Sequence, residues 1–303
     1  MCYGKIAGVD LPVSRLIIGC DNQQTMPDAA ALFDDFFERG GNAFDTAHIY
    51  AGGRHERLLG RWIEQRNIRP QVAVTVKGAH TPFCTPEFLD RQLRESLERL
   101  RTDYADIYMM HRDNPAIPVG EFVELLNEHH RAGRIKAFGG SNWTLERLKE
   151  AEAYAVGKGL RKFSCLSNNF SLARMVSPVW DGCISATGPA FKKWMAESGI
   201  SLLAWSSQAR GFFTERAHPD KREDEELVRC WYSEDNFQRR QRAVELAGKK
   251  GVRPINIALA YVLCQPFAAF ALVGPRRISE TVSTFDGLPV TLTPEEINWL
   301  NLE

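Results

Sequence analysis

Four polar side chains that could move a proton follow short apolar runs of the chain. Asp45 ends the run NAFD and Tyr50 comes five residues later, while Lys77 ends VAVTVK and His111 ends ADIYMMH. A phenol is a weak acid at neutral pH, because its reference pKa is about 10, and a nearby ammonium group lowers that pKa. We therefore expect Lys77 to lower the pKa of Tyr50 and Asp45 to be the counter-charge of Lys77. Together with a hydrogen bond from His111, this set suits protonation of a carbonyl oxygen during reduction.

These side chains can act together only if the fold brings the ends of their segments together. Short apolar or β-branched runs alternate with longer amphipathic runs eight times, from LIIG at 16–19 to AFALVGP at 269–275. Strands that alternate with helices form parallel sheets with right-handed crossovers, and eight such units favour a closed (β/α)8 TIM barrel. In such barrels the chemistry lies at the carboxyl ends of the strands. We predict one barrel domain over residues 1–303.

Composition narrows the class of protein further. The chain has 303 residues, 44% hydrophobic and 25% charged, and its 38 basic and 38 acidic side chains cancel, so no global field favours a nucleic acid partner. Its seven cysteines are odd in number and form no CxxC pair, which favours a reducing, cytoplasmic location and argues against a structural zinc site. The most apolar window, 255–274, is interrupted by Gln265 and Pro266 and predicts a buried helix and strand, not a membrane span.

The order and spacing of the motifs resemble those of the aldo-keto reductases. The family's Asp-Thr-Ala motif with its tyrosine appears as DTAHIY, the strand-ending lysine as TVK, the histidine as DIYMMHRD and the nicotinamide-contacting pair as GRIKAFGGSN. The resemblance extends from an expected N-terminal β-hairpin in YGKIAGVDLPVS to LTPEEINWL. It implies a metal-free, NADPH/NADP+-dependent reductase that acts on a small-molecule carbonyl substrate. The implied catalytic tetrad is Asp45, Tyr50, Lys77 and His111, with Tyr50 as the proton donor.

The resemblance also implies which residues contact the nicotinamide. Ser141 and Asn142 are expected at its carboxamide, and Ser167 replaces a glutamine that usually assists there, with Asn168 following it. Trp205 stands where the family usually has a tyrosine that stacks on the nicotinamide ring. We therefore expect a larger aromatic surface beneath the nicotinamide than the family usually presents.

The phosphates and the adenosine are expected on the last two strand ends. The segment AWSSQARG departs from the family pattern at Ser207 and Gln208, and GPRRISETVST has a glutamate and a threonine where the family usually has glutamine and asparagine. Arg276 predicts a preference for NADPH, because a guanidinium can bind the 2′-phosphate through two charge-assisted hydrogen bonds. The complete set of expected cofactor contacts is Ser141, Asn142, Ser167, Asn168, Trp205, Ser206, Gln208, Arg210, Gly211, Gly274, Arg276, Glu280 and Thr284.

Two alternative functions are compatible with parts of this pattern. A metal-dependent barrel hydrolase would use Asp45, His48, His80 and His111, but no two of these histidines have a chelating spacing. That alternative also leaves Tyr50 without a role. A non-catalytic NADP(H)-binding regulatory subunit would keep the tetrad, and the sequence shows no obvious partner-binding extension that favours it.

The substrate is left open between two classes. A hydroxylated or sugar-like carbonyl compound would suit polar loop residues, whereas an apolar one would suit aromatic residues. The long polar segment 212–238, which follows the seventh expected strand, is expected either to be a solvated surface or to act as a lid over the cofactor. The polar candidates are Asp21, Asn22, Gln23, Arg112, Asp113, Asn168 and Asn169, and the aromatic candidates are Phe83, Trp143, Trp180 and Trp231.

Overall fold

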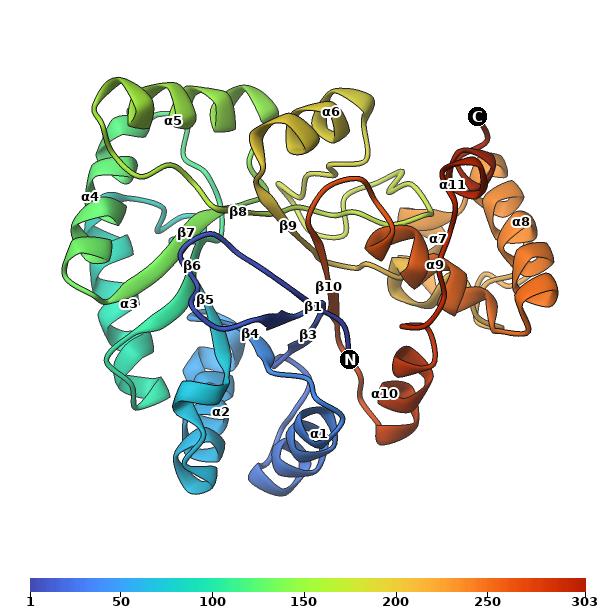
Figure 1. The fold of residues 1–303 in the computed structure, drawn as a ribbon, viewed down its shortest axis with the longest axis horizontal. Coiled ribbons are helices and arrows are strands. Elements are labelled where there is room, and N and C mark those ends of the chain that lie inside the picture. Colours follow the sequence, from blue (N-terminus) through green and yellow to red (C-terminus); the bar gives the residue numbers. More distant parts are fainter.

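Eight parallel strands close into a barrel in this computed structural model, which describes residues 1–303. The order around the barrel is β10-β3-β4-β5-β6-β7-β8-β9, so consecutive strands are neighbours, and the predicted (β/α)8 barrel is confirmed (Figure 1). The barrel strands are β3 (Leu16–Gly19), β4 (Ala43–Ala47), β5 (Ala73–Gly78), β6 (Ala105–Met110), β7 (Ile135–Ser141), β8 (Cys165–Ser167), β9 (Ser201–Ala204) and β10 (Ala269–Val273).

Helices surround the barrel and connect its strands (Figure 1). Their starts follow from local chemistry: the Thr85 hydroxyl accepts a hydrogen bond from the Phe88 backbone N–H at 3.3 Å, and Thr293 and Glu296 form a capping box. None of the helices is long and apolar enough to cross a bilayer. They are α1 (Met26–Glu38), α2 (Arg54–Arg66), α3 (Pro86–Leu100), α4 (Val119–Arg131), α5 (Leu145–Gly157), α6 (Pro189–Ser198), α7 (Glu225–Trp231), α8 (Glu234–Lys250), α9 (Pro254–Leu263), α10 (Ile278–Phe285) and α11 (Pro294–Leu300).

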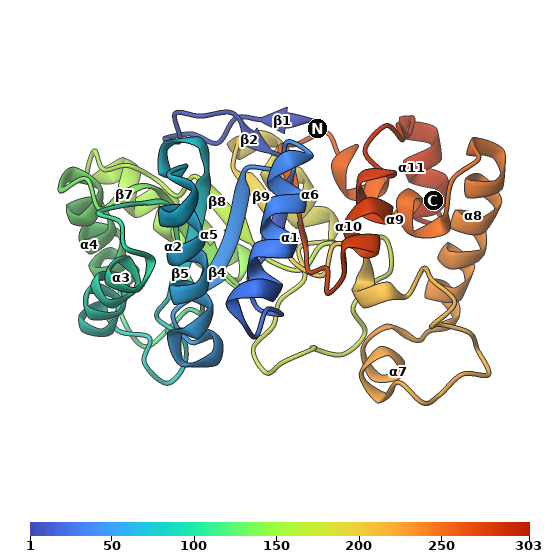
Figure 2. The same ribbon diagram turned by 90° about the horizontal axis from the view of Figure 1, so that it is seen from below.

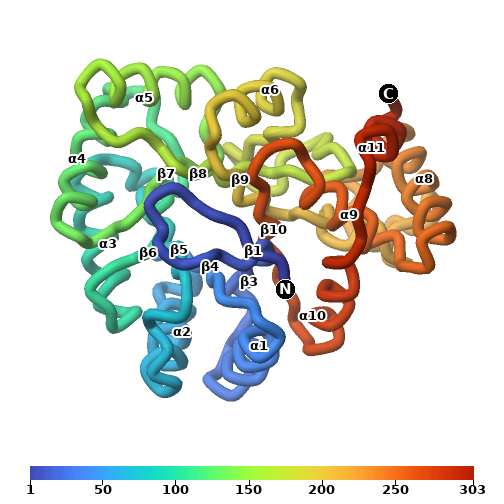
Figure 3. The backbone as a smooth tube through the Cα atoms, in the orientation of Figure 1, coloured from blue at the N-terminus to red at the C-terminus, as the bar shows by residue number.

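An N-terminal β-hairpin covers the amino end of the barrel, as the resemblance implied. Strand β1 (Tyr3–Gly4) pairs antiparallel with β2 (Val13–Ser14). Ile6 and Val13 are buried in the same apolar cluster as Phe270 of the barrel interior. Figure 2 shows the hairpin at the opposite end of the molecule from α7, and Figure 3 shows the N-terminal segment passing across the barrel. The hairpin therefore leaves the carboxyl ends of the strands available for a site.

The segment 212–238 differs from the solvated loop that the sequence suggested, because it contains α7. The Asp224 carboxylate caps this helix by accepting from the Leu227 backbone N–H at 3.0 Å. Cys230 and Arg229 of α7 bond to the loop that follows β8, the latter to the Val179 carbonyl at 3.1 Å. The helix is difficult to predict from the sequence because it begins within the charged run 218–226. Only a few apolar residues indicate its buried face. A role as a lid over the cofactor stays a prediction.

Candidate active site

The four expected catalytic side chains lie together at the carboxyl end of the barrel. Asp45 belongs to β4 and Lys77 to the neighbouring β5, His111 follows β6, and Tyr50 begins a short 3-10 turn (Tyr50–Gly53) after β4. Lys77 Nζ donates to Asp45 Oδ2 within the barrel, where the two side chains are 4% and 5% exposed. The pairing follows from the parallel register, which sets Ala47 opposite Lys77 and brings Asp45 within reach of the lysine side chain.

The Tyr50 ring lies close to both the ammonium group and the histidine. Lys77 Nζ is 5.5 Å from the centre of the Tyr50 ring, and the His111 ring centre is 5.9 Å from it at an interplanar angle of 81°. Tyr50 is half-buried, whereas the other three are buried. The structure therefore brings together one phenol, one ammonium, one carboxylate and one imidazole, as the sequence predicted.

The ion pair controls the charge at this end of the barrel. Burial raises the pKa of Asp45 above its ordinary value, although Lys77 opposes that shift, and Asp45 Oδ1 has no hydrogen-bond partner. Burial by itself would lower the pKa of Lys77, but Asp45 and Tyr50 outweigh it and the Lys77 pKa is raised. Lys77 therefore stays protonated at neutral pH and provides a fixed positive charge beside Tyr50.

The expected lowering of the Tyr50 pKa is wrong for the protein without ligands. Burial raises the pKa of Tyr50 to about 12, and Lys77 offsets only part of this increase. Burial and the positive charge of Lys77 hold the pKa of His111 well below its ordinary value, so this imidazole is neutral. His111 Nδ1 has no hydrogen-bond partner in the protein. The site thus presents a protonated phenol and a neutral imidazole, and both can donate a hydrogen bond.

Most of the side chains expected at the carboxamide already have hydrogen-bond partners within the protein. The Ser141 hydroxyl donates to the Ser167 carbonyl at 2.8 Å, and Asn142 Nδ2 donates to the Ser141 hydroxyl at 3.1 Å. Asn142 Oδ1 also accepts from the Ile184 backbone N–H at 3.1 Å. Asn168 likewise bonds to both the backbone N–H and the carbonyl of Trp143, so both amides are used inside the protein. Asn169 Oδ1 is buried and has no partner. Asn169 Nδ2 donates to the Trp205 carbonyl at 3.2 Å, so Asn169 keeps one unpartnered acceptor that Asn168 does not have. The contact of Asn168 with the carboxamide stays a prediction.

The residues after β9 show a similar division. Trp205 is half-buried, its indole N–H has no partner, and its ring centre is 6.1 Å from that of Trp180. Gln208 Nε2 donates to the Ile255 carbonyl at 3.3 Å, and Arg210 forms an ion pair with Glu226 of α7. The Trp205 ring is therefore available to a ligand, while the side chains of Gln208 and Arg210 already have protein partners.

The segment after β10 could hold an anionic group. Glu280 accepts from the Arg276 backbone N–H at 2.7 Å, and the Thr284 hydroxyl donates to the Glu280 carbonyl at 2.8 Å. Arg276 and the adjacent Arg277 are exposed, and neither guanidinium has a carboxylate within 4 Å. Glu280 therefore serves the start of α10, and two free guanidinium groups remain beside it for a phosphate.

Three of the four residues that the metal-dependent alternative would use as ligands have other partners in the structure. Asp45 pairs with Lys77, and His48 Nε2 lies 2.6 Å from Glu95 Oε2 on α3. His80 Nδ1 is 2.8 Å from the backbone carbonyl of Thr81. No group of three or more His, Cys, Asp or Glu side chains is arranged to hold one metal ion.

Some of the candidate substrate residues are buried or have partners inside the protein, whereas others are exposed. Asp113 forms an ion pair with Arg147 at 3.0 Å, so its carboxylate is not free for a hydroxylated substrate. Trp143 and Trp231 are fully buried in the core, whereas Phe83 is 49% and Trp180 is 52% exposed. Phe83 belongs to the loop after β5 and Trp180 to the loop after β8, so both lie at the carboxyl end of the barrel. Phe83 and Trp180 are therefore the two aromatic candidates whose rings are exposed at this end of the barrel.

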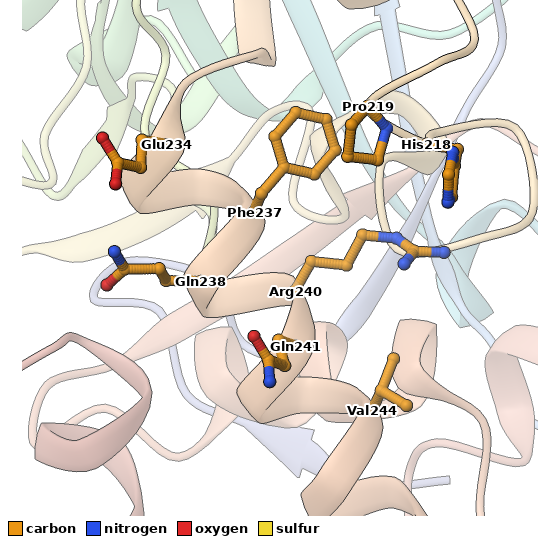
Figure 4. Close-up of a pocket in the computed structure, with 8 residues that line it drawn as sticks. All are labelled: His218, Pro219, Glu234, Phe237, Gln238, Arg240, Gln241 and Val244. Atoms are coloured by element: carbon orange, nitrogen blue, oxygen red, sulfur yellow. The ribbon is translucent and has the colours of Figure 1, made fainter.

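A surface groove of about 520 Å³ lies apart from these residues. Figure 4 shows it along α8, with Arg240 extending toward His218. Arg240 Nη2 donates to the Thr214 carbonyl at 3.2 Å. None of the expected site residues lines this groove, whose lining residues are His218, Pro219, Glu234, Phe237, Gln238, Arg240, Gln241 and Val244.

Comparisons with known proteins place this geometry in one family. The model of the aldo/keto reductase family matches residues 16–301. The chain is 26% identical to versiconal hemiacetal acetate reductase from Aspergillus parasiticus, over 99% of this chain and 96% of that protein. It is 25% identical to an aryl-alcohol dehydrogenase from Pestalotiopsis microspora, over 89% of this chain and 70% of that protein. Its fold is similar to an aldo/keto reductase from Klebsiella pneumoniae in complex with NADP and acetate, with a TM-score of 0.74, 20% identity, and coverage of 97% and 93%.

Removal of the Lys77 charge should destabilise the fold as well as the site. Lys77→Met leaves the buried Asp45 carboxylate unpaired, and we expect the free energy of unfolding in urea to fall by about 3–5 kcal/mol. The double variant Asp45→Asn/Lys77→Met should regain part of that loss, because no unpaired charge remains. As a control, Arg66→Met breaks the exposed pair with Asp34 and should cost less than about 1 kcal/mol. Equal losses in Lys77→Met and Arg66→Met would contradict the assigned importance of the buried pair.

Proposed function

The chain belongs to the aldo/keto reductase family, and from this premise we propose that it is an NADPH-dependent enzyme that reduces an aldehyde or ketone to an alcohol. The observation that carries the proposal is the proximity of the Tyr50 ring to both the Lys77 ammonium and the His111 ring. Seven cysteines without a disulfide are consistent with the cytoplasmic location that we propose for it.

In this proposal the side chains divide the work of one proton transfer. NADPH, when bound, supplies the hydride that the carbonyl carbon receives. The neutral His111 ring donates a hydrogen bond that orients the carbonyl oxygen, and the Tyr50 hydroxyl gives that oxygen its proton. Lys77 stabilises the phenolate that remains on Tyr50, and Asp45 holds the ammonium in place. The high pKa of Tyr50 means that the phenol is fully protonated before the substrate arrives.

The cofactor would be held by groups that the protein leaves unsatisfied. The buried Oδ1 of Asn169 could accept from the carboxamide N–H, beside Ser141 and Asn142, and the Trp205 ring offers a stacking surface for the nicotinamide. The free guanidinium groups of Arg276 and Arg277 fit a phosphate on the adenosine. In this proposal the unpartnered acceptor of Asn169 suits the carboxamide, the Trp205 ring suits the nicotinamide, and the two unpaired guanidinium groups suit the 2′-phosphate.

We propose that the substrate is an aromatic or otherwise apolar carbonyl compound. The exposed rings of Phe83 and Trp180 support this, because an apolar substrate would remove their surface from water. The polar candidate Asp113 is neutralised by Arg147, which weakens the case for a sugar. The similarity to an aryl-alcohol dehydrogenase points the same way.

The direct experiment measures NADPH consumption with a panel of benzaldehydes, aryl ketones and aldoses. We expect turnover with the aromatic aldehydes and little with the aldoses. Higher turnover with aldoses would contradict the proposed substrate class. NADPH binding without turnover of any carbonyl compound would instead favour the regulatory subunit.

Removal of the Tyr50 hydroxyl should abolish most of the activity. Tyr50→Phe keeps the ring but loses the proton donor, so we expect kcat to fall at least about 100-fold, while the Kd for NADPH measured by fluorescence titration stays within about twofold. Retention of most of the turnover would refute the assigned role.

The two directions of the reaction should respond differently to pH. Reduction uses the phenol, which is protonated below a pKa of about 12, and the pKa of His111 is well below its ordinary value. Titration of Tyr50 or His111 should therefore not change the reduction rate between about pH 6 and 9. Oxidation of the alcohol needs the phenolate, whose fraction rises about tenfold per pH unit below the pKa. Single-turnover rates should therefore be flat for reduction and rise with pH for oxidation. A reduction rate that falls with a midpoint below about pH 9 would show that the Tyr50 pKa is not raised.

Arg276 should determine the preference for the phosphorylated cofactor. Arg276→Ala removes a guanidinium from the 2′-phosphate, so the KM for NADPH should rise at least about tenfold, equivalent to about 1.4 kcal/mol, while that for NADH changes only a few fold. Arg253→Ala is a matched control, since Arg253 pairs with Asp286 at the far end of α10. Equal losses for both cofactors, or a wild type that prefers NADH, would mean that the phosphate lies elsewhere.

A further inference from the structure

The turn that carries Tyr50 has an unfavourable backbone. Ala51, Gly52 and Gly53 follow Tyr50 with φ values of 47°, 62° and 84°. The left-handed region is open to glycine but costs a residue with a Cβ, such as Ala51, roughly 1–2 kcal/mol. No side chain caps the turn from its own residues. The position of the Tyr50 ring therefore depends on contacts from outside the turn.

Arg99 of α3 provides such contacts on both sides of the turn. Its Nη1 donates to the His48 carbonyl at 3.2 Å and to Glu56 Oε2 at 2.9 Å. His48 lies two residues before Tyr50, and Glu56 lies in the first turn of α2, directly after Gly53. A Cβ on Gly53 would be 2.6 Å from the guanidinium, so the glycine is also what allows Arg99 to approach. One planar cation thus joins the beginning and the end of the turn.

Burial makes this connection difficult to replace. The Glu56 side chain is completely buried, and Arg99 is 17% exposed. Arg99 Nη2 is also 3.4 Å from Glu95 Oε2, the same oxygen that contacts His48 Nε2 at 2.6 Å. A buried carboxylate needs its cation, and the planar fork of arginine can reach several acceptors at once where lysine presents a point charge. Both the backbone and the side chain of His48 are therefore tied to α3.

We propose that Arg99 is a positioning residue for the reaction: by holding residues 48–56 it sets the distance of the Tyr50 hydroxyl from Lys77 and His111. Its own partners are His48, Glu56 and Glu95, and it lies on a helix outside the barrel (Figure 1). Arg99 acts only through the placement of Tyr50. The inference rests on the proposed function, in which Tyr50 supplies the proton.

The test compares Arg99→Met with Arg94→Met, which removes a 55% exposed arginine of the same helix that pairs with Asp90. With the best aromatic aldehyde of the panel, we expect Arg99→Met to lower kcat at least about tenfold, because displacements near 1 Å can cost about 100-fold in rate. The Kd for NADPH should stay within about twofold, and Arg94→Met should match the wild type. Arg99→Lys should recover part of kcat, since it keeps the charge beside Glu56.

A double-variant comparison separates positioning of Tyr50 from general damage. In a Tyr50→Phe background, Arg99→Met should change the residual rate by less than about twofold, since the group that Arg99 positions is already gone. Losses that multiply in the double variant would overturn the inference, and so would a wild-type kcat in Arg99→Met. If Arg99→Met does not fold, Glu56→Gln weakens the same contact with little change in shape. Glu56→Gln should lower kcat at least about threefold in the otherwise wild-type protein, but not in the Tyr50→Phe variant. An unchanged kcat in the otherwise wild-type protein would overturn the inference.

The outcomes also distinguish this inference from the proposed function. If Tyr50→Phe keeps its turnover, the proton-donor assignment fails and the role of Arg99 fails with it. If Tyr50→Phe loses its turnover while Arg99→Met keeps it, only the role of Arg99 is refuted.

Discussion

The buried ion pair between Lys77 and Asp45 is the interaction on which the rest of the site depends. Neither charge could remain ionised alone in the barrel, because burial disfavours both charged forms. Parallel pairing of β4 with β5 brings the two side chains together, and the closed barrel holds that register. The site therefore has a positive charge that the fold itself keeps in place, and the neighbouring Tyr50 and His111 respond to it.

The balance between burial and this charge determines the protonation states of the other two groups. Burial raises the pKa of Tyr50 more than Lys77 lowers it, whereas burial and Lys77 both lower the pKa of His111. The free protein consequently presents two neutral donors to a carbonyl oxygen. In the proposed reaction, Lys77 therefore does not acidify the free phenol. It would instead stabilise the phenolate that forms when Tyr50 gives up its proton.

Partners inside the protein decide which polar residues remain for ligands. The side chain of Asn168 bonds to Trp143, that of Arg210 to Glu226 and that of Asp113 to Arg147. Asn169 Oδ1 and the Arg276 guanidinium have no such partner. A buried polar group usually has a partner, so the unpartnered Asn169 Oδ1 at the carboxyl end of the barrel is an acceptor that the proposed cofactor would satisfy. Asp113 is already paired, whereas the exposed rings of Phe83 and Trp180 are open to contact with the proposed substrate.

The sequence by itself determined the barrel, the order of its strands and the four polar residues that the structure brings together at the carboxyl ends of the strands. The alternation of apolar and amphipathic runs and the position of polar residues at strand ends are local features, so they can be recognised without a structure. Helix α7 could not be predicted in this way, because its buried face consists of few residues within a run of charges. Only the tertiary structure decided the direction of the Tyr50 pKa shift, which of Asn168 and Asn169 keeps an unpartnered side-chain atom, and the contact of Arg99 with a turn more than forty residues away. These depend on burial and on side-chain direction, which arise when distant segments pack together.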